Sequence, residues 1–159
     1  MKKRVPGLTD SSLDRFLRRA RKAAKLHGTV NVLVTNSREL QTLNRRFRGK
    51  NEPTDVLSFP PAAVLQNGFA GDVAISADIA TESARRLGHS LADEIKILSL
   101  HGLLHLAGYD HETDRGEMAR KERALRESLR LPVSLIERAE QSIRATAKAR
   151  ARKKGKTAR

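Results

Sequence analysis

The segment from residue 90 to residue 108, SLADEIKILSLHGLLHLAG, places the strongest constraint on the fold. It reads as one long helix that begins near Ser90 and ends at Gly108. Its second half is nearly all apolar, and a stretch of this kind is drawn into the protein interior. The leucines that drive this burial are Leu100, Leu103, Leu104 and Leu106. We therefore expect this helix to be buried.

Three of the five histidines lie in or just after this helix, in the stretch HGLLHLAGYDH. His101 and His105 are four residues apart, which places both imidazoles on one helical face, one turn apart. Gly108 can adopt a positive φ and let the chain turn back, so that His111 can reach the same point. Two buried imidazoles without partners would be costly, and a metal ion removes that cost.

The pattern H-x-x-x-H-x-x-G-x-x-H has the ligand spacing of metzincin proteases. Three neutral imidazoles with an open fourth position are typical of a catalytic zinc site. The chain has no cysteine, and its other histidines, His27 and His89, are distant in sequence. We therefore predict a metal site of three histidines whose fourth position is open to water or substrate, as in catalytic zinc sites. Such a protease also needs a glutamate directly after the first histidine, and Gly102 stands there, which speaks against a protease.

The remaining segments alternate between helical and extended patterns. Helices are predicted over 9–28, 36–49, 76–88 and 113–130, and strands over 29–35, 55–60 and 71–76. Leu40, Leu43 and Phe47 form the expected apolar face of the second helix. A last helix is expected from about Val133. This order predicts a small sheet covered by helices, in an α+β or α/β domain.

The net charge of +14 is concentrated at the two ends of the chain. Residues 1–27 carry +7 and residues 141–159 carry +8, whereas residues 28–140 carry −1. Such ends suit a polyanion, and we prefer nucleic acid as the partner because phosphate contacts release counterions. A solubilising tail and an acidic membrane surface are the other interpretations. We expect one domain over residues 1–140 and a basic, disordered tail over 141–159.

Other features of the composition indicate the compartment. No run of about 18 apolar residues occurs, so we expect no membrane span. The basic N-terminus lacks the apolar region of a secretory signal. The absence of cysteine fits a reducing compartment. We therefore expect a cytoplasmic protein without a membrane partner.

Three motifs resemble the YbeY family of bacterial metal-dependent endoribonucleases, also described as ribosomal RNA maturation factors. They are RGKNEPTDVLSFP (48–60), GDVAIS (71–76) and HGLLHLAGYDH (101–111), and the resemblance covers about residues 28–131. It implies a single α+β domain with a small mixed sheet, and a metal in a cleft at the end of the long helix. It also implies that His101, His105 and His111 bind zinc, and that Arg48 is the family's functional arginine.

The resemblance further implies single-strand cleavage in ribosomal RNA processing, including maturation of the 3′ end of small-subunit RNA, and ribosome quality control. Ribosomal proteins and a ribosome-associated GTPase are the implied partners. The alternative is an RNA-binding ribosome assembly factor whose metal is structural. Asp110 either orients an imidazole or caps the next helix, and Tyr109 either stacks on a base or packs against the helix end. The residues identify no general base.

Overall fold

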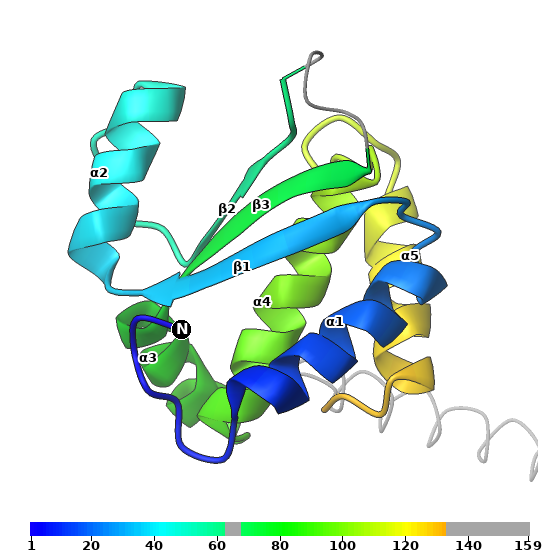
Figure 1. The fold of residues 1–159 in the computed structure, drawn as a ribbon, viewed down its shortest axis with the longest axis horizontal. Helices are drawn as coiled ribbons and strands as arrows, with labels where there is room; N and C mark the ends of the chain where they lie inside the picture. The colour runs from blue at the N-terminus through cyan, green and yellow to red at the C-terminus, as the bar shows by residue number, and fades with distance from the viewer. Residues whose placement is uncertain (63–67, 133–159) are drawn as a thin grey trace, which may run out of the picture.

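The computed structural model of the protein describes residues 1–62 and 68–132 (Figure 1). The predicted helix from Val133 and the tail over 141–159 lie outside the described residues. The elements in chain order are α1 (Asp10–Ala23), β1 (Thr29–Thr35), α2 (Ser37–Arg48), β2 (Val56–Phe59), β3 (Phe69–Ser76), α3 (Ala77–Leu87), α4 (Leu91–Leu106) and α5 (Glu117–Ser128).

The strands of the described residues form one mixed sheet in the order β1-β3-β2. β1 is parallel to the central strand β3, and β2 is antiparallel to it. The edge strand β2 pairs Val56 with Ile75 and Phe59 with Asp72. Helices pack on both faces of this sheet, and the chain is a small single α+β domain. The predicted fold class is therefore confirmed.

Helix α4 lies at the centre of the molecule. Figure 1 shows it against the sheet, with α1, α3 and α5 around it. Its buried residues lie on all sides of the helix rather than along one stripe, as an interior helix requires. These residues are Ala92, Glu94, Ile95, Ile97, Leu98, Ser99, Leu100, Gly102, Leu103 and Leu104. The predicted burial of this segment is confirmed.

The two faces of the sheet bury different side chains. Val73 and Ile75 belong to the main core, which includes the apolar residues of α4. Ala74, between them in sequence, points to the other face and forms a smaller cluster with Leu57 and with Leu40 of α2. The edge strand β2 therefore has α4 on one face and α2 on the other.

Capping side chains begin four of the five helices among the described residues. Their oxygens accept hydrogen bonds from backbone N–H groups of the first turn, which would otherwise lack partners. The caps of α1 to α4 are Thr9, Asn36, Ser76 and Ser90. At the other ends of α2 and α3, Gly49 and Gly88 take the left-handed conformation expected of them.

Two predicted helix boundaries are wrong. α1 ends at Ala23 rather than near Gly28, and Lys25 then adopts a left-handed φ of 56°. α5 begins at Glu117 rather than at residue 113. The carboxylate of Asp114 accepts hydrogen bonds from the backbone N–H groups of Gly116, at 2.7 Å, and Met118, at 2.8 Å. These bonds hold the residues before α5 in a turn.

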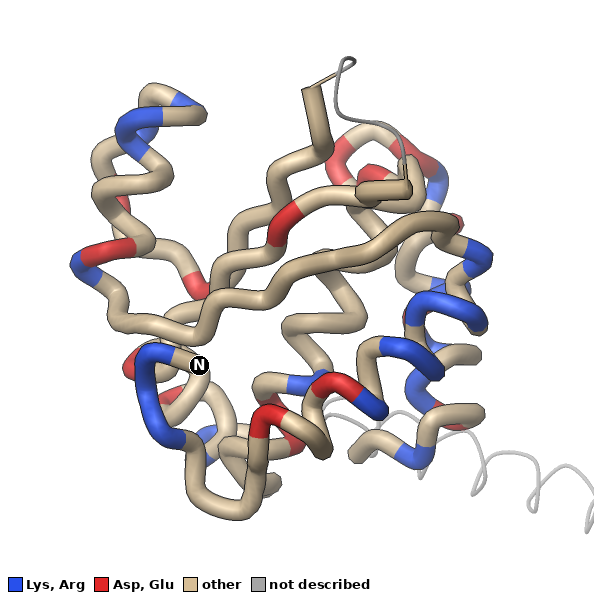
Figure 2. Tube along the Cα trace, viewed as in Figure 1, with Lys and Arg blue, Asp and Glu red and all other residues tan. Residues whose placement is uncertain are grey.

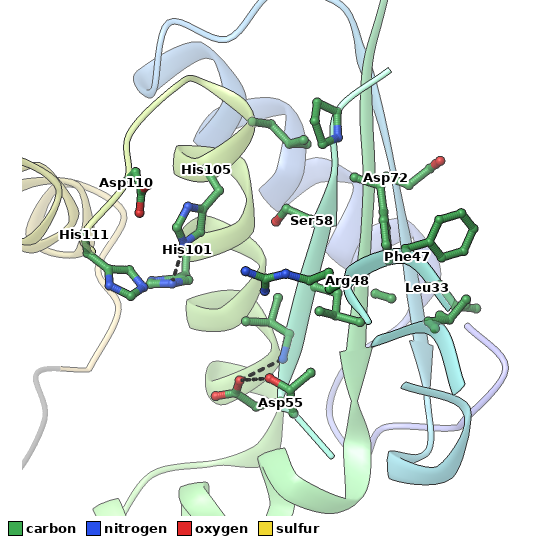
Figure 3. Close-up of a pocket in the computed structure, with 18 of the residues that line it drawn as sticks. Leu33, Phe47, Arg48, Asp55, Ser58, Asp72, His101, His105, Asp110 and His111 are labelled. Carbon is green, nitrogen blue, oxygen red and sulfur yellow. Dashed lines mark hydrogen bonds between the residues drawn. The ribbon is translucent and has the colours of Figure 1, made fainter. Parts of the chain in front are cut away.

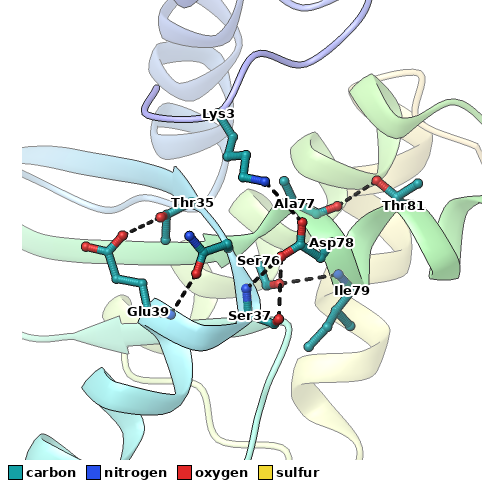
Figure 4. A network of polar contacts seen from close by, with 10 residues as sticks. Lys3, Thr35, Ser37, Glu39, Ser76, Ala77, Asp78, Ile79 and Thr81 are labelled. Atoms are coloured by element: carbon teal, nitrogen blue, oxygen red, sulfur yellow. Dashed lines mark hydrogen bonds and ion pairs between the residues drawn. The ribbon is translucent and has the colours of Figure 1, made fainter.

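A polar network joins α2 to α3 where the parallel strands end (Figure 4). The Asp78 carboxylate accepts hydrogen bonds from the backbone N–H of Ser37, at 3.0 Å, and from its hydroxyl, at 3.4 Å. Lys3 pairs with the same carboxylate. The hydrogen bond from the Ser37 amide lowers the pKa of Asp78, so this carboxylate stays charged at neutral pH. The network anchors the N-terminal end of α2, and Arg48 lies at its other end.

Many of the Lys and Arg positions of the described residues lie in groups along the chain. Figure 2 shows such groups in the segment before α1, on α1, on α5 and at the C-terminal end of α2. Over residues 1–62 and 68–132, no helix has both the length and the apolar character needed to cross a membrane.

Candidate metal centre and cleft

The end of α4 and the turn after it bring three histidines together (Figure 3). His101 and His105 lie one turn apart on α4. Gly108, with φ of 92°, reverses the chain as predicted, so that His111 approaches the other two. The ligand nitrogens of the three residues all lie within 4.8 Å of one another. The three histidines could therefore hold a metal ion.

One pair of ligand nitrogens has a spacing close to that of two ligands on a shared zinc ion. Nε2 of His101 and Nε2 of His105 are 3.1 Å apart. Two ligands at tetrahedral angles on one zinc, with Zn–N bonds of about 2.0–2.1 Å, would be roughly 3.3–3.4 Å apart. His101 and His105 are half-buried, and His111 is exposed. An ion held here would keep one side open to the solvent.

The surroundings of His105 favour the neutral imidazole, which is the form that binds a metal. Burial lowers the pKa of His105, and the neighbouring His101 and His111 lower it further. The ring is therefore uncharged at neutral pH and has a lone pair available for an ion.

The sequence did not point to Glu122, which contacts the centre from α5. Its Oε2 lies 3.0 Å from Nδ1 of His101. A charged carboxylate can only accept, so Nδ1 is the donor, and in a neutral imidazole with this proton the lone pair is on Nε2. Burial by itself raises the pKa of Glu122, but the hydrogen bond from His101 and the charge of Arg126 outweigh burial and lower that pKa. Glu122 thus selects the tautomer of His101 that can bind an ion.

Gly102 lies where α4 packs most closely on the sheet. A Cβ atom at this position would be 2.6 Å from Cγ1 of Val73 and 3.1 Å from Oγ of Ser58. The Ser58 hydroxyl also donates a hydrogen bond of 3.2 Å to the Gly102 carbonyl. A glutamate therefore has no room at the position where metzincins have their general base.

Asp110 stabilises the turn between α4 and α5. One carboxylate oxygen accepts from the backbone N–H of Glu112, at 3.0 Å, and the other accepts from the hydroxyl of Thr113, at 3.1 Å. The hydrogen bond from Glu112 makes the largest contribution to the lowered pKa of Asp110. Among the described residues its carboxylate makes no hydrogen bond to an imidazole. Asp110 therefore neither orients an imidazole by a hydrogen bond nor caps α5, whose N-cap is Gly116.

The histidines line a cleft of about 920 Å³. Its lining comes from the end of α4 and the turn after it, from residues 54–60 in and around β2, from α2, and from single residues of β1 and β3. Arg48, the last residue of α2, lines the same cleft. In the view of Figure 3 its guanidinium points toward the side that carries the histidines. The arginine and the three histidines named by the sequence are therefore brought to one cavity.

Other side chains that the sequence brought forward have different positions. Tyr109 packs against the main core. The ring of His89 contacts the buried carboxylate of Glu94, and Ser90 caps α4. Phe47 was expected on a buried face of α2, and this expectation is wrong: it is 59% exposed.

Comparison with known proteins gives the family. The family model described as Endoribonuclease YbeY matches residues 2–130 of this chain. The match includes α1 and the residues before it, and is thus longer than the range of 28–131 that the motifs indicated.

Similar proteins agree with this match. Endoribonuclease YbeY of Koribacter versatilis is 56% identical over 152 residues, which cover 96% of this chain and 98% of that protein. Endoribonuclease YbeY of Nautilia profundicola is 50% identical over 111 residues, covering 70% and 79%. The solution structure of TM1509 from Thermotoga maritima is 32% identical, covers 77% of this chain and 84% of that one, and gives a TM-score of 0.52. The chain belongs to the Endoribonuclease YbeY family.

Proposed function

We propose that this protein is a zinc-dependent endoribonuclease that cleaves single-stranded regions of ribosomal RNA. The matching family and the relatives carry the name of an endoribonuclease. The observation that carries the proposal is that the three histidines and Arg48 line one cleft. A metal centre and a guanidinium on the same cavity suit a phosphodiester, since each can bind a phosphate oxygen.

Zinc is the proposed ion because of the donor set. Three imidazoles converge, and the chain has no thiolate to offer. A zinc ion with three protein ligands keeps a position for water or substrate, whereas structural zinc sites use four protein ligands. When bound, zinc would polarise a phosphoryl oxygen and lower the pKa of a water molecule.

The protein's own residues have distinct roles in this proposal. His101, His105 and His111 bind the ion, and Glu122 holds His101 in the required tautomer. Arg48 binds the scissile phosphate through two oxygens and stabilises the negative charge that develops at phosphorus. The attacking group is either water or the RNA 2′-hydroxyl. A 2′,3′-cyclic phosphate product would identify the 2′-hydroxyl.

The proposed cellular role is maturation of the 3′ end of small-subunit ribosomal RNA, together with ribosome quality control, in the cytoplasm. The basic ends of the chain support an RNA partner, and the absence of cysteine fits a reducing compartment. Ribosomal proteins and a ribosome-associated GTPase are the proposed protein partners, on the strength of the family resemblance.

The test compares cleavage of a single-stranded RNA by the wild type, by Arg48→Ala and by Arg38→Ala. Arg38 is an exposed arginine at the other end of the same helix, so it controls for the loss of a positive charge. We expect Arg48→Ala to lower kcat by about 10²- to 10³-fold, the cost of losing one donor to a transition-state charge. Arg38→Ala should cleave normally.

Equal activity of Arg48→Ala and wild type would contradict the role of Arg48. Absence of cleavage by zinc-loaded wild type, with intact RNA binding, would favour the assembly factor with a structural metal.

A further inference from the structure

Phe47 is the one large hydrophobic side chain among the described residues that is mostly exposed. It lies near the C-terminal end of α2, one residue before Arg48. Leu40, two turns earlier, is fully buried against the sheet. The apolar face of α2 thus leaves the sheet before the helix ends, and Phe47 is presented to the cleft.

Two contacts hold the Phe47 ring in place. It lies edge-to-face with Phe59 of β2, with ring centroids 5.3 Å apart. The guanidinium of Arg46 lies 5.4 Å from its centroid. Both rings line the same cleft as the histidines. The ring is therefore supported from one side while more than half of the side chain stays open to solvent.

The charges around this ring indicate what it binds. Arg45, Arg46, Arg48 and Lys50 are all exposed, and among the described residues none of the four forms an ion pair. Figure 2 shows this basic group at the free end of α2. The helix dipole accounts for basic residues at a helix C-terminus, but it gives no reason for an exposed phenyl ring among them. A ligand that suits both the basic side chains and the exposed phenyl ring has negative charges and flat apolar faces.

We propose that Phe47, supported by Phe59, is a stacking platform for an unpaired RNA base. The inference rests on the proposed function and defines its substrate further. In the view of Figure 3, Arg48 lies between Phe47 and the histidines. A base stacked on Phe47 thus belongs to a nucleotide next to the phosphate that Arg48 binds.

This platform gives a physical reason for selecting single strands. A base inside a duplex has both faces covered by its neighbours, whereas an unpaired base offers its π-face to an aromatic side chain. Stacking of this kind tolerates any base, so Phe47 selects strandedness rather than sequence. The alternative ligand of this site is an acidic protein. The exposed basic side chains around the single ring of Phe47 favour a nucleic acid.

The experiment measures binding of the zinc-loaded full chain to a fluorescein-labelled single-stranded RNA of ten nucleotides, by fluorescence anisotropy on a timescale shorter than cleavage. A series of the same RNA carries one abasic nucleotide at each position in turn. We expect Phe47→Ala to weaken binding of the intact RNA by about 10- to 100-fold, as loss of one stacked base predicts. Phe47→Trp should bind like the wild type.

The abasic series supplies the matched control. At one position the missing base should weaken wild-type binding, and there Phe47→Ala should cause no further loss. Because Phe47 is exposed, the Tm of the Phe47→Ala and Phe47→Trp proteins should differ little from that of the wild type. Equal binding of the intact RNA by wild type and Phe47→Ala would overturn the inference. It would also be overturned if Phe47→Ala lowered the affinity further for every abasic RNA of the series.

This readout separates the two proposals. If wild type binds in the predicted base-dependent way but cleaves nothing, the proposed enzyme activity fails and the platform stands. If cleavage occurs and binding ignores Phe47, the platform fails and the enzyme activity stands.

Discussion

At the scale of single residues, His101 is held from outside its own helix. Glu122 accepts a hydrogen bond from Nδ1–H of His101, and Arg126 pairs with the same carboxylate. Nε2 of His101 is thereby directed to the point that it shares with His105. An ion at this point would meet one ligand that is already in its binding tautomer.

Replacement of Glu122 tests this arrangement. We expect Glu122→Ala to weaken zinc binding by about 10- to 100-fold, because the tautomer and orientation of His101 are no longer fixed. Glu122→Gln keeps an acceptor and should be intermediate. The dissociation constant is measured by competition with a chromophoric chelator.

Glu127→Ala, an exposed glutamate on the same helix, is the control and should bind zinc like the wild type. If Glu122→Ala bound zinc with the same dissociation constant as the wild type, the role of Glu122 would be contradicted.

The sequence predicts the three histidines of the site, but it does not predict the positions of Glu122 and Phe47. His101 and His105 are linked by helical spacing, and Gly108 predicts the turn that delivers His111. Glu122 lies 21 residues from His101, and only the packing of α5 on α4 brings them together. Phe47 was misplaced because helical periodicity identifies an apolar face but not where the neighbouring sheet ends.

At the scale of elements, the packing of α4 on the sheet depends on Gly102, which has no side chain. Val73 of β3 and Ser58 of β2 occupy the space that a Cβ at position 102 would need. The glycine weakens helix propensity by about 1 kcal/mol relative to alanine. The close approach that it allows places the histidine-bearing turns of α4 beside β2 and the cleft.

A substitution at this position should destabilise the fold in spite of the better helix propensity. We expect Gly102→Ala to lower the free energy of unfolding by about 1–3 kcal/mol, the usual cost of overpacking a core. Val73→Ala removes the two methyl groups nearest to the added atom. The cost of Gly102→Ala should therefore be smaller in a Val73→Ala background, as urea unfolding of the four proteins would show.

A Gly102→Ala protein as stable as the wild type would mean that α4 is not tightly packed here. Equal costs in both backgrounds would mean that Val73 is not the residue that the added methyl group meets.

Element positions followed from the sequence where a local signal governs them. The helices predicted from residues 36, 76 and 90 begin where Asn36, Ser76 and Ser90 cap them, and α2 ends before Gly49. Caps and a left-handed glycine act through hydrogen bonds and φ angles of their own neighbourhood. The start of α5 was misjudged because Asp114 accepts hydrogen bonds from the backbone N–H groups of Gly116 and Met118, so the helix begins only after it. Hydrogen bonding of this kind by a side chain is not visible in apolar periodicity.

At the scale of the whole molecule, the cleft exists because segments that are distant in the sequence meet. Strand order β1-β3-β2 puts β2 at the edge, with α2 and α4 on its two faces. The sequence predicted the strands and helices but not their order in space, since strand pairing depends on contacts between distant residues. The family resemblance predicted a mixed sheet, and the structure confirms this prediction.

The distribution of charge predicts a role for the C-terminal tail. Deletion of residues 141–159 removes a net charge of +8. We expect the truncated protein to bind single-stranded RNA more weakly at low salt, and log K to depend less steeply on log salt concentration, because fewer counterions are released. Anisotropy titrations at several salt concentrations measure the slope, and an unchanged slope would show that the tail does not contact RNA.

The central claim is that His101, His105 and His111 hold the ion that cleaves RNA. Its most direct test is zinc content and single-stranded RNA cleavage, measured on the same preparations of wild type and His105→Ala, with His27→Ala as a histidine outside the site. We predict one zinc per chain and cleavage for wild type and His27→Ala, and loss of both for His105→Ala. A His105→Ala protein that kept full zinc content and full cleavage would contradict the claim.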